Sequence, residues 1–351
     1  MPVDRSPLRS IQRGLLLSLA LSLAVIVWLN LRFITPATGA LLRQADPLYL
    51  GLAAAVIVVT WLAEALRLAL LLRLSGPVPP FRRLVRIVLA TFFAAGVTPL
   101  AAGQGPVQVY LLHREGVAIG RATAVLSLRL FLTTLTFTLG VADLATVFPR
   151  LISPRLAAPL RWAIPGALAV VAAFAALLLN AHAATQALQR LLTRQRSGSR
   201  RSALLDRTLH HLQRELEEFA STLGHLRRRD LLLLAAALLL TALYWLLDFS
   251  VAPLLLLALH RTFDPVKVIL LQALLAFLVS VVPLPGGSGV SELGFAGLFR
   301  GVVPAAGLGL FVSLWRLLTY HLSVLAGAVS LAVSLRRKAY SGSSDGGSSS
   351  V

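Results

Sequence analysis

Long apolar blocks separated by short basic connectors make up most of the chain. Six of the blocks are long enough to cross a bilayer as helices, because a membrane-spanning helix needs about 20 predominantly apolar residues. These blocks are Gly14–Ile34, Leu48–Leu72, Ala122–Thr146, Pro159–Ala181, Leu231–Leu259 and Ala305–Val333. The pattern predicts an all-α fold, a polytopic membrane helix bundle.

The first block has a rival interpretation as a signal peptide. Three arginines precede it, and the small residues Ala37–Ala40 follow it. Its apolar core is longer than the roughly 7–15 residues of a signal sequence. A retained anchor helix is therefore the preferred interpretation.

Two further apolar segments are interrupted by proline and glycine. The segment Leu84–Leu112 is broken at Thr98–Pro106, and the segment Val266–Phe299 is broken at Pro283–Gly289. Proline removes a helical hydrogen bond and ends or kinks a helix. We therefore predict two broken, re-entrant helical hairpins.

The two breaks share a sequence pattern. Pro-Leu-x-x-Gly-x-Gly begins at both Pro99 and Pro283, and at the same offset Trp61–Glu64 resembles Trp245–Asp248. With a shift of two or three residues in this offset, the segment Ser127–Arg129 also resembles the segment Ser313–Arg316. Three matches in the same order predict an inverted repeat, an architecture typical of transporters. A pair of ordinary tight turns between short helices is the alternative.

Basic residues predict the topology and the domain organisation. Under the positive-inside rule both termini lie in the cytoplasm, the first hairpin begins and ends inside, and the second begins and ends outside. We expect a multi-pass protein of the cytoplasmic membrane with one integral membrane domain. Its boundaries are residues 1–340, with repeat halves at 48–146 and 231–333, a basic cytoplasmic connector at 182–230 and a disordered tail at 341–351.

Composition supports the membrane interpretation. Of the 351 residues 57% are hydrophobic and only 13% are charged, whereas soluble domains carry about 25% charged residues. The net charge of +19 does not indicate nucleic-acid binding, because the arginines stand at the ends of apolar blocks. The absence of cysteine excludes disulfides and thiolate sites. We expect no metal and no cofactor.

The polar connector contains one amphipathic helix. Apolar residues recur in it at spacings of three and four, the period of one helix face, at Leu205, Leu209, Leu212, Leu216, Phe219, Leu223 and Leu226. This helix packs either on the membrane domain or on a second copy. The alternative is that its basic face binds anionic lipid headgroups.

Charged and polar residues within the apolar blocks are the candidate substrate-binding residues, because charges facing lipid are costly and intramembrane charges are commonly functional. They are Arg67, Arg129, Arg316, Glu64, Asp248, Glu292, Gln104 and Gln108. The arginines would bind a phosphate, with the glutamines adding hydrogen bonds. Salt bridges and hydrogen bonds that hold helices together are the alternative, and Glu64 and Arg67 can pair on one helix face.

Glycines at the two breaks would let the backbone approach a headgroup. They are Gly103, Gly105, Gly286, Gly287 and Gly289. Motifs of soluble enzymes, such as a P-loop or HExxH, are absent from the sequence. No catalytic residue is predicted.

The second break carries a family resemblance. Residues Pro285 to Glu292 read Pro-Gly-Gly-x-Gly-x-x-Glu, and with this motif the chain resembles the lysylphosphatidylglycerol synthase transmembrane region family, also called flippase-like. Arg67, Arg129 and Arg316 add supporting matches. The resemblance implies the handling of glycerol- or polyprenyl-based lipids, since in fused members this region moves aminoacylated phosphatidylglycerol between leaflets. Synthase activity is not expected, because no aminoacyl-transfer domain follows the last block.

The predicted function is therefore that of a lipid translocase. It would move an anionic, aminoacylated or polyprenyl-linked lipid across the membrane. The alternatives are a membrane-embedded lipid enzyme, an accessory scaffold subunit and a small-solute transporter. The expected partners are membrane lipids with anionic headgroups, together with a second copy or a lipid-synthesis enzyme.

Overall fold

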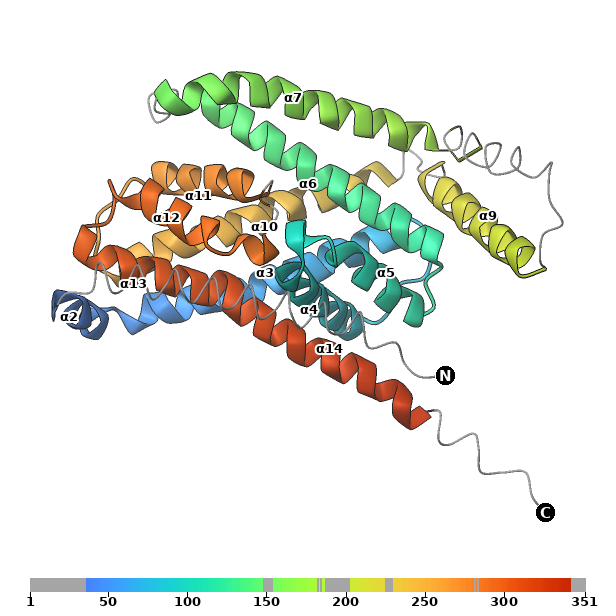
Figure 1. Ribbon diagram of the computed structural model, residues 1–351, viewed down its shortest axis with the longest axis horizontal. Helices are drawn as coiled ribbons and strands as arrows, with labels where there is room; N and C mark the ends of the chain where they lie inside the picture. Colours follow the sequence, from blue (N-terminus) through green and yellow to red (C-terminus); the bar gives the residue numbers. More distant parts are fainter. Residues whose placement is uncertain are drawn as a thin grey trace, which may run out of the picture. The chain divides into compact units, whose positions relative to one another are not determined.

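A computed structural model shows the chain as an assembly of helices (Figure 1). It describes residues 36–147, 154–181, 183, 185–186, 203–224, 230–280, 282 and 284–341. Every regular element within these ranges is a helix, which confirms the all-α prediction. The predicted anchor helix at 14–34, nearly half of the basic connector and the tail after Ser341 lie outside the described residues.

Four helices are long and apolar enough to cross a membrane. They are α3 (Pro47–Arg73), α6 (Ile119–Val147, apolar to Gly140), α10 (Leu231–Ala258) and the stretch Gly307–Ser334. The last stretch runs through α13 (Ala305–Arg316), η5 (Leu317–His321) and α14 (Leu322–Ser341). All four coincide with predicted spans. The predicted span Pro159–Ala181 overlaps α7 (Pro154–Leu179), which contains a shorter apolar helix, Ile164–Leu178.

The chain divides into two compact units. Unit 1 consists of residues 1–63, 82–108 and 244–351, and unit 2 of residues 64–81 and 109–243. Each unit combines segments that are distant in sequence. The boundaries predicted for the repeat halves remain a prediction.

Unit 1 contains both predicted breaks, each between two helices. The first joins α4 (Phe81–Val97) through η1 (Pro99–Ala101) to α5 (Gln104–Arg114). The second joins α11 (Pro265–Ser280) through η4 (Pro285–Gly287) to α12 (Val290–Phe299). With 16 and 10 residues and a rise of about 1.5 Å per residue, α11 and α12 are each shorter than the roughly 30 Å hydrocarbon core. They pack against each other, which confirms a broken helical hairpin.

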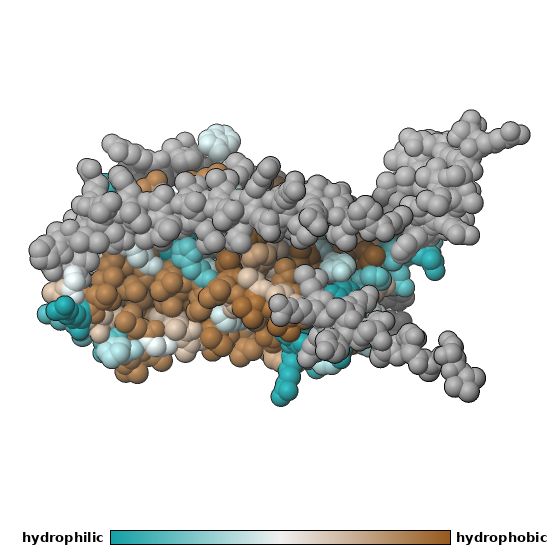
Figure 2. Space-filling view, turned by 60° about the horizontal axis from the view of Figure 1, so that its bottom comes forward, coloured by the Kyte–Doolittle hydropathy of each residue, from teal (hydrophilic) through white to brown (hydrophobic). Residues whose placement is uncertain are grey.

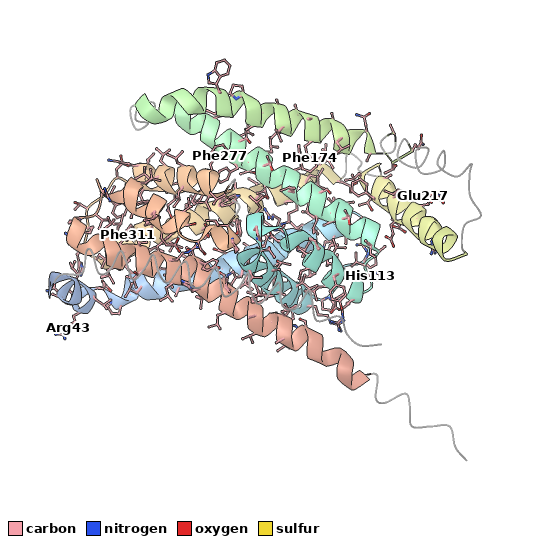
Figure 3. All side chains as sticks on the ribbon, viewed as in Figure 1. Arg43, His113, Phe174, Glu217, Phe277 and Phe311 are labelled. Carbon is pink, nitrogen blue, oxygen red and sulfur yellow. The ribbon has the colours of Figure 1, made fainter. Side chains whose placement is uncertain are left out.

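Aromatic side chains fill the core of unit 1 beside the second hairpin. Phe295 and Phe299 stack with ring centroids 4.2 Å apart, and Trp315 stacks on the other side of Phe295 at 4.1 Å. Phe311, labelled in Figure 3, joins them from α13 and is completely buried. These rings pack α12 against α13. Helix α2 (Pro36–Gln44) also packs on α13.

Unit 2 is built around α6. This helix packs along α7 and along α9 (Ala203–Gly224). Phe174 of α7, labelled in Figure 3, meets Phe131 of α6 edge to face. From α9, Leu223 and Phe219 pack on Ala124. The prediction that the connector helix packs on the membrane domain is thereby confirmed. Its binding of lipid headgroups remains a prediction.

Large apolar side chains are exposed along several helices. They include Leu48 on α3, Leu232 and Leu239 on α10, and Leu325 and Val329 on α14. Figure 2 shows hydrophobic residues, in brown, over much of the coloured part of that view. Soluble monomers rarely expose apolar areas of this extent, and membrane helices present them to lipid.

Candidate functional site

The two breaks adopt nearly the same backbone path and lie in contact within unit 1. The residue after the proline has φ 53° and ψ 23° at Leu100, and φ 59° and ψ 14° at Gly286. Pro99 therefore corresponds to Pro285 in backbone geometry, whereas the sequence match pairs Pro99 with Pro283. The structural correspondence between the two turns is thus shifted by two residues from the sequence match. The inverted repeat as a whole remains a prediction.

The first break is closed by the side chain of Thr98. Its hydroxyl donates to Ala94 O at 2.7 Å and accepts from the Gly103 N–H at 2.9 Å. A Cβ at Gly103 would lie 2.9 Å from Thr98 Cγ2, so this glycine lets the chain turn tightly. Gly105 faces open space. Gln104 begins α5, and Gln108 on the same helix is fully buried.

The second break has glycine at three positions with positive φ, Gly286, Gly287 and Gly289. Residues with a Cβ rarely adopt this conformation, although Leu100 and Ala101 adopt it in the first break. A Cβ at Gly286 would overlap the Tyr320 ring, and one at Gly287 would overlap Val279. Gly289 is the N-cap of α12, and its N–H donates to Glu292 Oε2 at 2.7 Å.

Arg316 ties the second break to the last membrane-spanning stretch. Its Nε lies 2.8 Å from Glu292 Oε1, and its Nη2 donates to Gly286 O at 2.7 Å and to Ser288 Oγ at 3.3 Å. The guanidinium also lies over the Tyr320 ring, with Cζ 3.9 Å from the centroid. Glu292 and Arg316 are 0% and 5% exposed. These contacts fit the structural alternative, and binding of a phosphate by Arg316 remains a prediction.

A second charged cluster lies in unit 2. Glu64 Oε2 is 2.6 Å from Arg67 Nη2, and Glu64 Oε1 is 2.8 Å from Arg129 Nε. Arg67 also donates to the hydroxyls of Thr133 and Thr241 at 3.1 and 3.2 Å. The Glu64 carboxylate thus links α3 to α6, and the hydrogen bond from Arg67 to Thr241 links α3 to α10. The Glu64–Arg67 pair follows from the helical spacing, but the position of Arg129 required the fold.

Asp248 lines a cavity of about 220 Å³ in unit 1. The lining comes from α3, α4, α10, α14, both breaks and η5. Its polar members include Thr60, Trp61, Thr319 and Ser323. Of the predicted site residues, Asp248 and Gly286 reach this cavity. Gln272, on α11, donates its side-chain N–H to Phe249 O.

The four polar lining residues were not predicted as site residues. Thr319 and Ser323 are four apart, and Thr60 lies four residues before Glu64. These spacings place the members of each pair on one helix face. Polar residues on one face of an otherwise apolar helix were the sequence pattern from which these residues could have been predicted.

One segment of the cavity wall is π-helical. Residues Leu317–His321 form the π-helix η5, which carries Thr319 and Tyr320. Short π-helical segments in α-helices occur frequently at functional sites. The cavity and the adjoining second break are therefore the best candidate site among the residues that the structure describes.

Comparison with known proteins identifies the family. A profile of the lysylphosphatidylglycerol synthase TM region matches residues 15–327, which is most of the chain. The chain belongs to this family. A "UPF0104 membrane protein" of Archaeoglobus fulgidus is 28% identical over 342 residues, covering 92% of this chain and 96% of that protein. The resemblance carried by Pro285 to Glu292 is thus confirmed.

Substitution of Gly286 tests the second break of this family member. We expect Gly286→Ala to lower stability by about 2 kcal/mol or more, since overpacking costs about 1–3 kcal/mol and positive φ adds strain. The measurement is the unfolding temperature in mild detergent. The matched control is Gly105→Ala, because that position is open. Equal unfolding temperatures for the two variants would show that the Tyr320 contact is not tight.

Proposed function

We propose that this protein moves a phospholipid between the two leaflets of the membrane. The observation that carries the proposal is the contact between two broken helical segments beside a cavity that contains Asp248 and several hydroxyl groups. Irregular backbone at membrane depth is tolerated where protein or a water-filled cavity covers it. Secondary transporters bind their substrates at such breaks.

In this proposal the headgroup occupies the cavity and the acyl chains remain in the bilayer. Broken helices beside the cavity supply backbone that lies close to it, since Ala101 and Gly286 both belong to its lining. The exposed apolar side chains of α3, α10 and α14 would contact lipid. The name of the family refers to a lipid synthase, which fits a lipid substrate.

The charged clusters have a supporting role in the proposal. Arg67 and Arg316 hold helices together through Glu64 and Glu292, and the side chain of Arg129 is 14% exposed. Arg129 is therefore the most exposed of the three arginines. The proposal also includes the predicted location in the cytoplasmic membrane, with both termini in the cytoplasm.

Lipid translocation can be measured directly in vesicles. We expect purified protein in phosphatidylglycerol–phosphatidylethanolamine vesicles to expose an acyl-labelled fluorescent phospholipid of the inner leaflet to dithionite. Ala95 lines the cavity, so Ala95→Leu fills it. We expect a loss of rate on the order of tenfold, the factor that corresponds to about 1.4 kcal/mol. The matched control is Ala55→Leu, which places the same change on an exposed position of α3.

The outcomes separate the proposal from its alternatives. A rate equal to that of protein-free vesicles would refute translocation of the phospholipids used. Equal rates for Ala95→Leu and Ala55→Leu would exclude the cavity as the path. Mass spectrometry of the same lipids identifies an enzyme, because an enzyme changes the mass of the lipid and a translocase does not.

A further inference from the structure

Most donor hydrogens in the lining of the cavity beside Asp248 are already used, and several hydroxyl oxygens remain as acceptors. Ser323 is the exception, since its Oγ accepts from Trp61 and its own hydrogen stays available. Thr60 donates its hydroxyl hydrogen to Val56 O at 2.8 Å, and Thr319 donates to Trp315 O at 2.8 Å. A hydroxyl has one hydrogen and two lone pairs. Each of these oxygens can therefore still accept a hydrogen bond from a ligand but cannot donate one.

The aromatic side chains of the lining follow the same pattern. Trp61 Nε1 donates to Ser323 Oγ at 3.1 Å, and the Tyr320 hydroxyl donates to Gly96 O at 3.1 Å. Indole nitrogen is a donor only, so Trp61 has no N–H left for a ligand. The phenol oxygen of Tyr320 keeps its acceptor capacity.

Asp248 is the single charged side chain among the described residues that line the cavity. In that part of the chain no basic side chain forms an ion pair with it. The neighbouring Arg316 is held by Glu292 and the second break and does not line the cavity. A carboxylate within a membrane span is costly and is normally paired or functional.

The aromatic rings add attraction for a positive charge. Trp61, Tyr244 and Tyr320 all line the cavity, and a cation near such ring faces is stabilised by their quadrupoles. A negatively charged phosphate would be repelled by the Asp248 carboxylate and would find a single donor, the Ser323 hydroxyl, among Thr60, Trp61, Thr319, Tyr320 and Ser323. The volume of about 220 Å³ is below the roughly 300–1,000 Å³ of ordinary ligand pockets, so the site suits one small group.

We propose that this cavity is a binding subsite for a primary ammonium group. An –NH₃⁺ group has three donors and no acceptor, which complements the Asp248 carboxylate and the oxygens of Thr60 and Thr319. A quaternary ammonium of similar charge cannot use these acceptors. The ammonium belongs either to the headgroup of an amine-bearing phospholipid or to a free amine. The lipid source rests on the proposed function, whereas the ammonium site does not.

Binding of small amines to the full chain in detergent tests the subsite. Ligand-observed NMR titration with ethylammonium should give saturable binding with a Kd on the order of 1 mM, the range for a ligand of so few atoms. Tetramethylammonium should bind several-fold more weakly. Asp248→Asn should weaken ethylammonium at least about tenfold, and Thr60→Val should weaken it several-fold.

The control is Asp143→Asn, which makes the same change at an exposed position of α6. Its ethylammonium affinity should equal that of the unmodified chain, and the unfolding temperatures of all variants show that they fold. Equal binding of ethylammonium by Asp248→Asn would overturn the proposal. So would the absence of saturable ethylammonium binding, or tetramethylammonium affinity equal to or above that of ethylammonium.

Competition by lipids identifies the source of the amine. In nanodiscs, displacement of ethylammonium by phosphatidylethanolamine but not by phosphatidylcholine supports a lipid headgroup. Displacement by neither lipid supports a free amine, and equal displacement by both would contradict primary-amine recognition. Because these measurements are made at equilibrium, a failure of lipid translocation in vesicles leaves their outcome unaffected.

Discussion

Replacing Glu292 with alanine is expected to destabilise the protein by about 3–5 kcal/mol, the usual cost of breaking a buried ion pair. The carboxylate is fully buried and has two separate tasks. One oxygen pairs with Arg316, and the other accepts the N–H of Gly289 at the start of α12. The substitution leaves a buried guanidinium without its counter-charge and also removes the helix cap. The unfolding temperature in mild detergent, followed by intrinsic fluorescence, measures the effect.

A double-mutant cycle separates the two tasks of Glu292. Arg316→Met removes the positive charge, so Glu292→Ala combined with Arg316→Met should be more stable than the sum of the two single effects predicts. Any loss that remains in the double variant belongs to the cap and to packing. Glu217→Ala is the control, because Glu217 is exposed on α9 (Figure 3). An unfolding temperature for Glu292→Ala equal to that of this control would contradict the interpretation.

Replacing Glu64 with glutamine should have an effect of similar size in unit 2. Glutamine keeps the shape of the side chain but removes the charge shared by Arg67 and Arg129. Two guanidinium groups then face each other, and Arg67 is only 2% exposed. We expect a loss of about 3–5 kcal/mol, since a charge left unpaired in the interior is strongly destabilising. The same thermal measurement reports it.

The matched control for Glu64→Gln is Glu217→Gln, which makes the same change on an exposed helix face. Adding Arg129→Met to Glu64→Gln should recover part of the lost stability, because it removes one of the two repelling charges. If the double variant is less stable than Glu64→Gln alone, Arg129 contributes mainly by packing. In that case the ion-pair interpretation of this cluster is wrong.

These results also bear on the proposed function. If Glu64 and Glu292 serve mainly to neutralise arginines, the stability losses should occur without a change in amine binding in variants that still fold. Asp248→Asn should behave in the opposite way, since Asp248 has no cationic partner among the described residues. A comparison of stability with binding across these three carboxylates therefore separates structural charges from the proposed subsite.

Most of the architecture could be predicted from the sequence. The lengths of the apolar blocks placed α3, α6, α10 and the last span, because the bilayer thickness imposes a minimum helix length. The prolines and glycines at Thr98–Pro106 and Pro283–Gly289 predicted the two breaks, because these residues interrupt a helix at their own positions. The motif from Pro285 to Glu292 placed the chain in its family.

The pairing of the charged residues needed more than spacing. Glu64 and Arg67 are neighbours on one helix, so their ion pair could be predicted. The partners Glu292 and Arg316 stand on different helices, and so do Glu64 and Arg129. Sequence spacing carries no information about which helices pack together. The sequence therefore indicated which charges are buried but not which of them are neutralised.

The sequence by itself determined that the chain is a helical membrane protein with two breaks and buried charges, because helix length, proline and glycine act over a few residues. Only the tertiary structure decided that the two breaks meet, that Arg316 is held by Glu292, and that Asp248 faces a cavity together with Thr60 and Thr319. Each of these facts depends on side chains brought together from distant segments. The direction in which Thr60, Thr319 and Tyr320 donate their hydrogen bonds decides what the cavity can bind, and that direction is set by the fold.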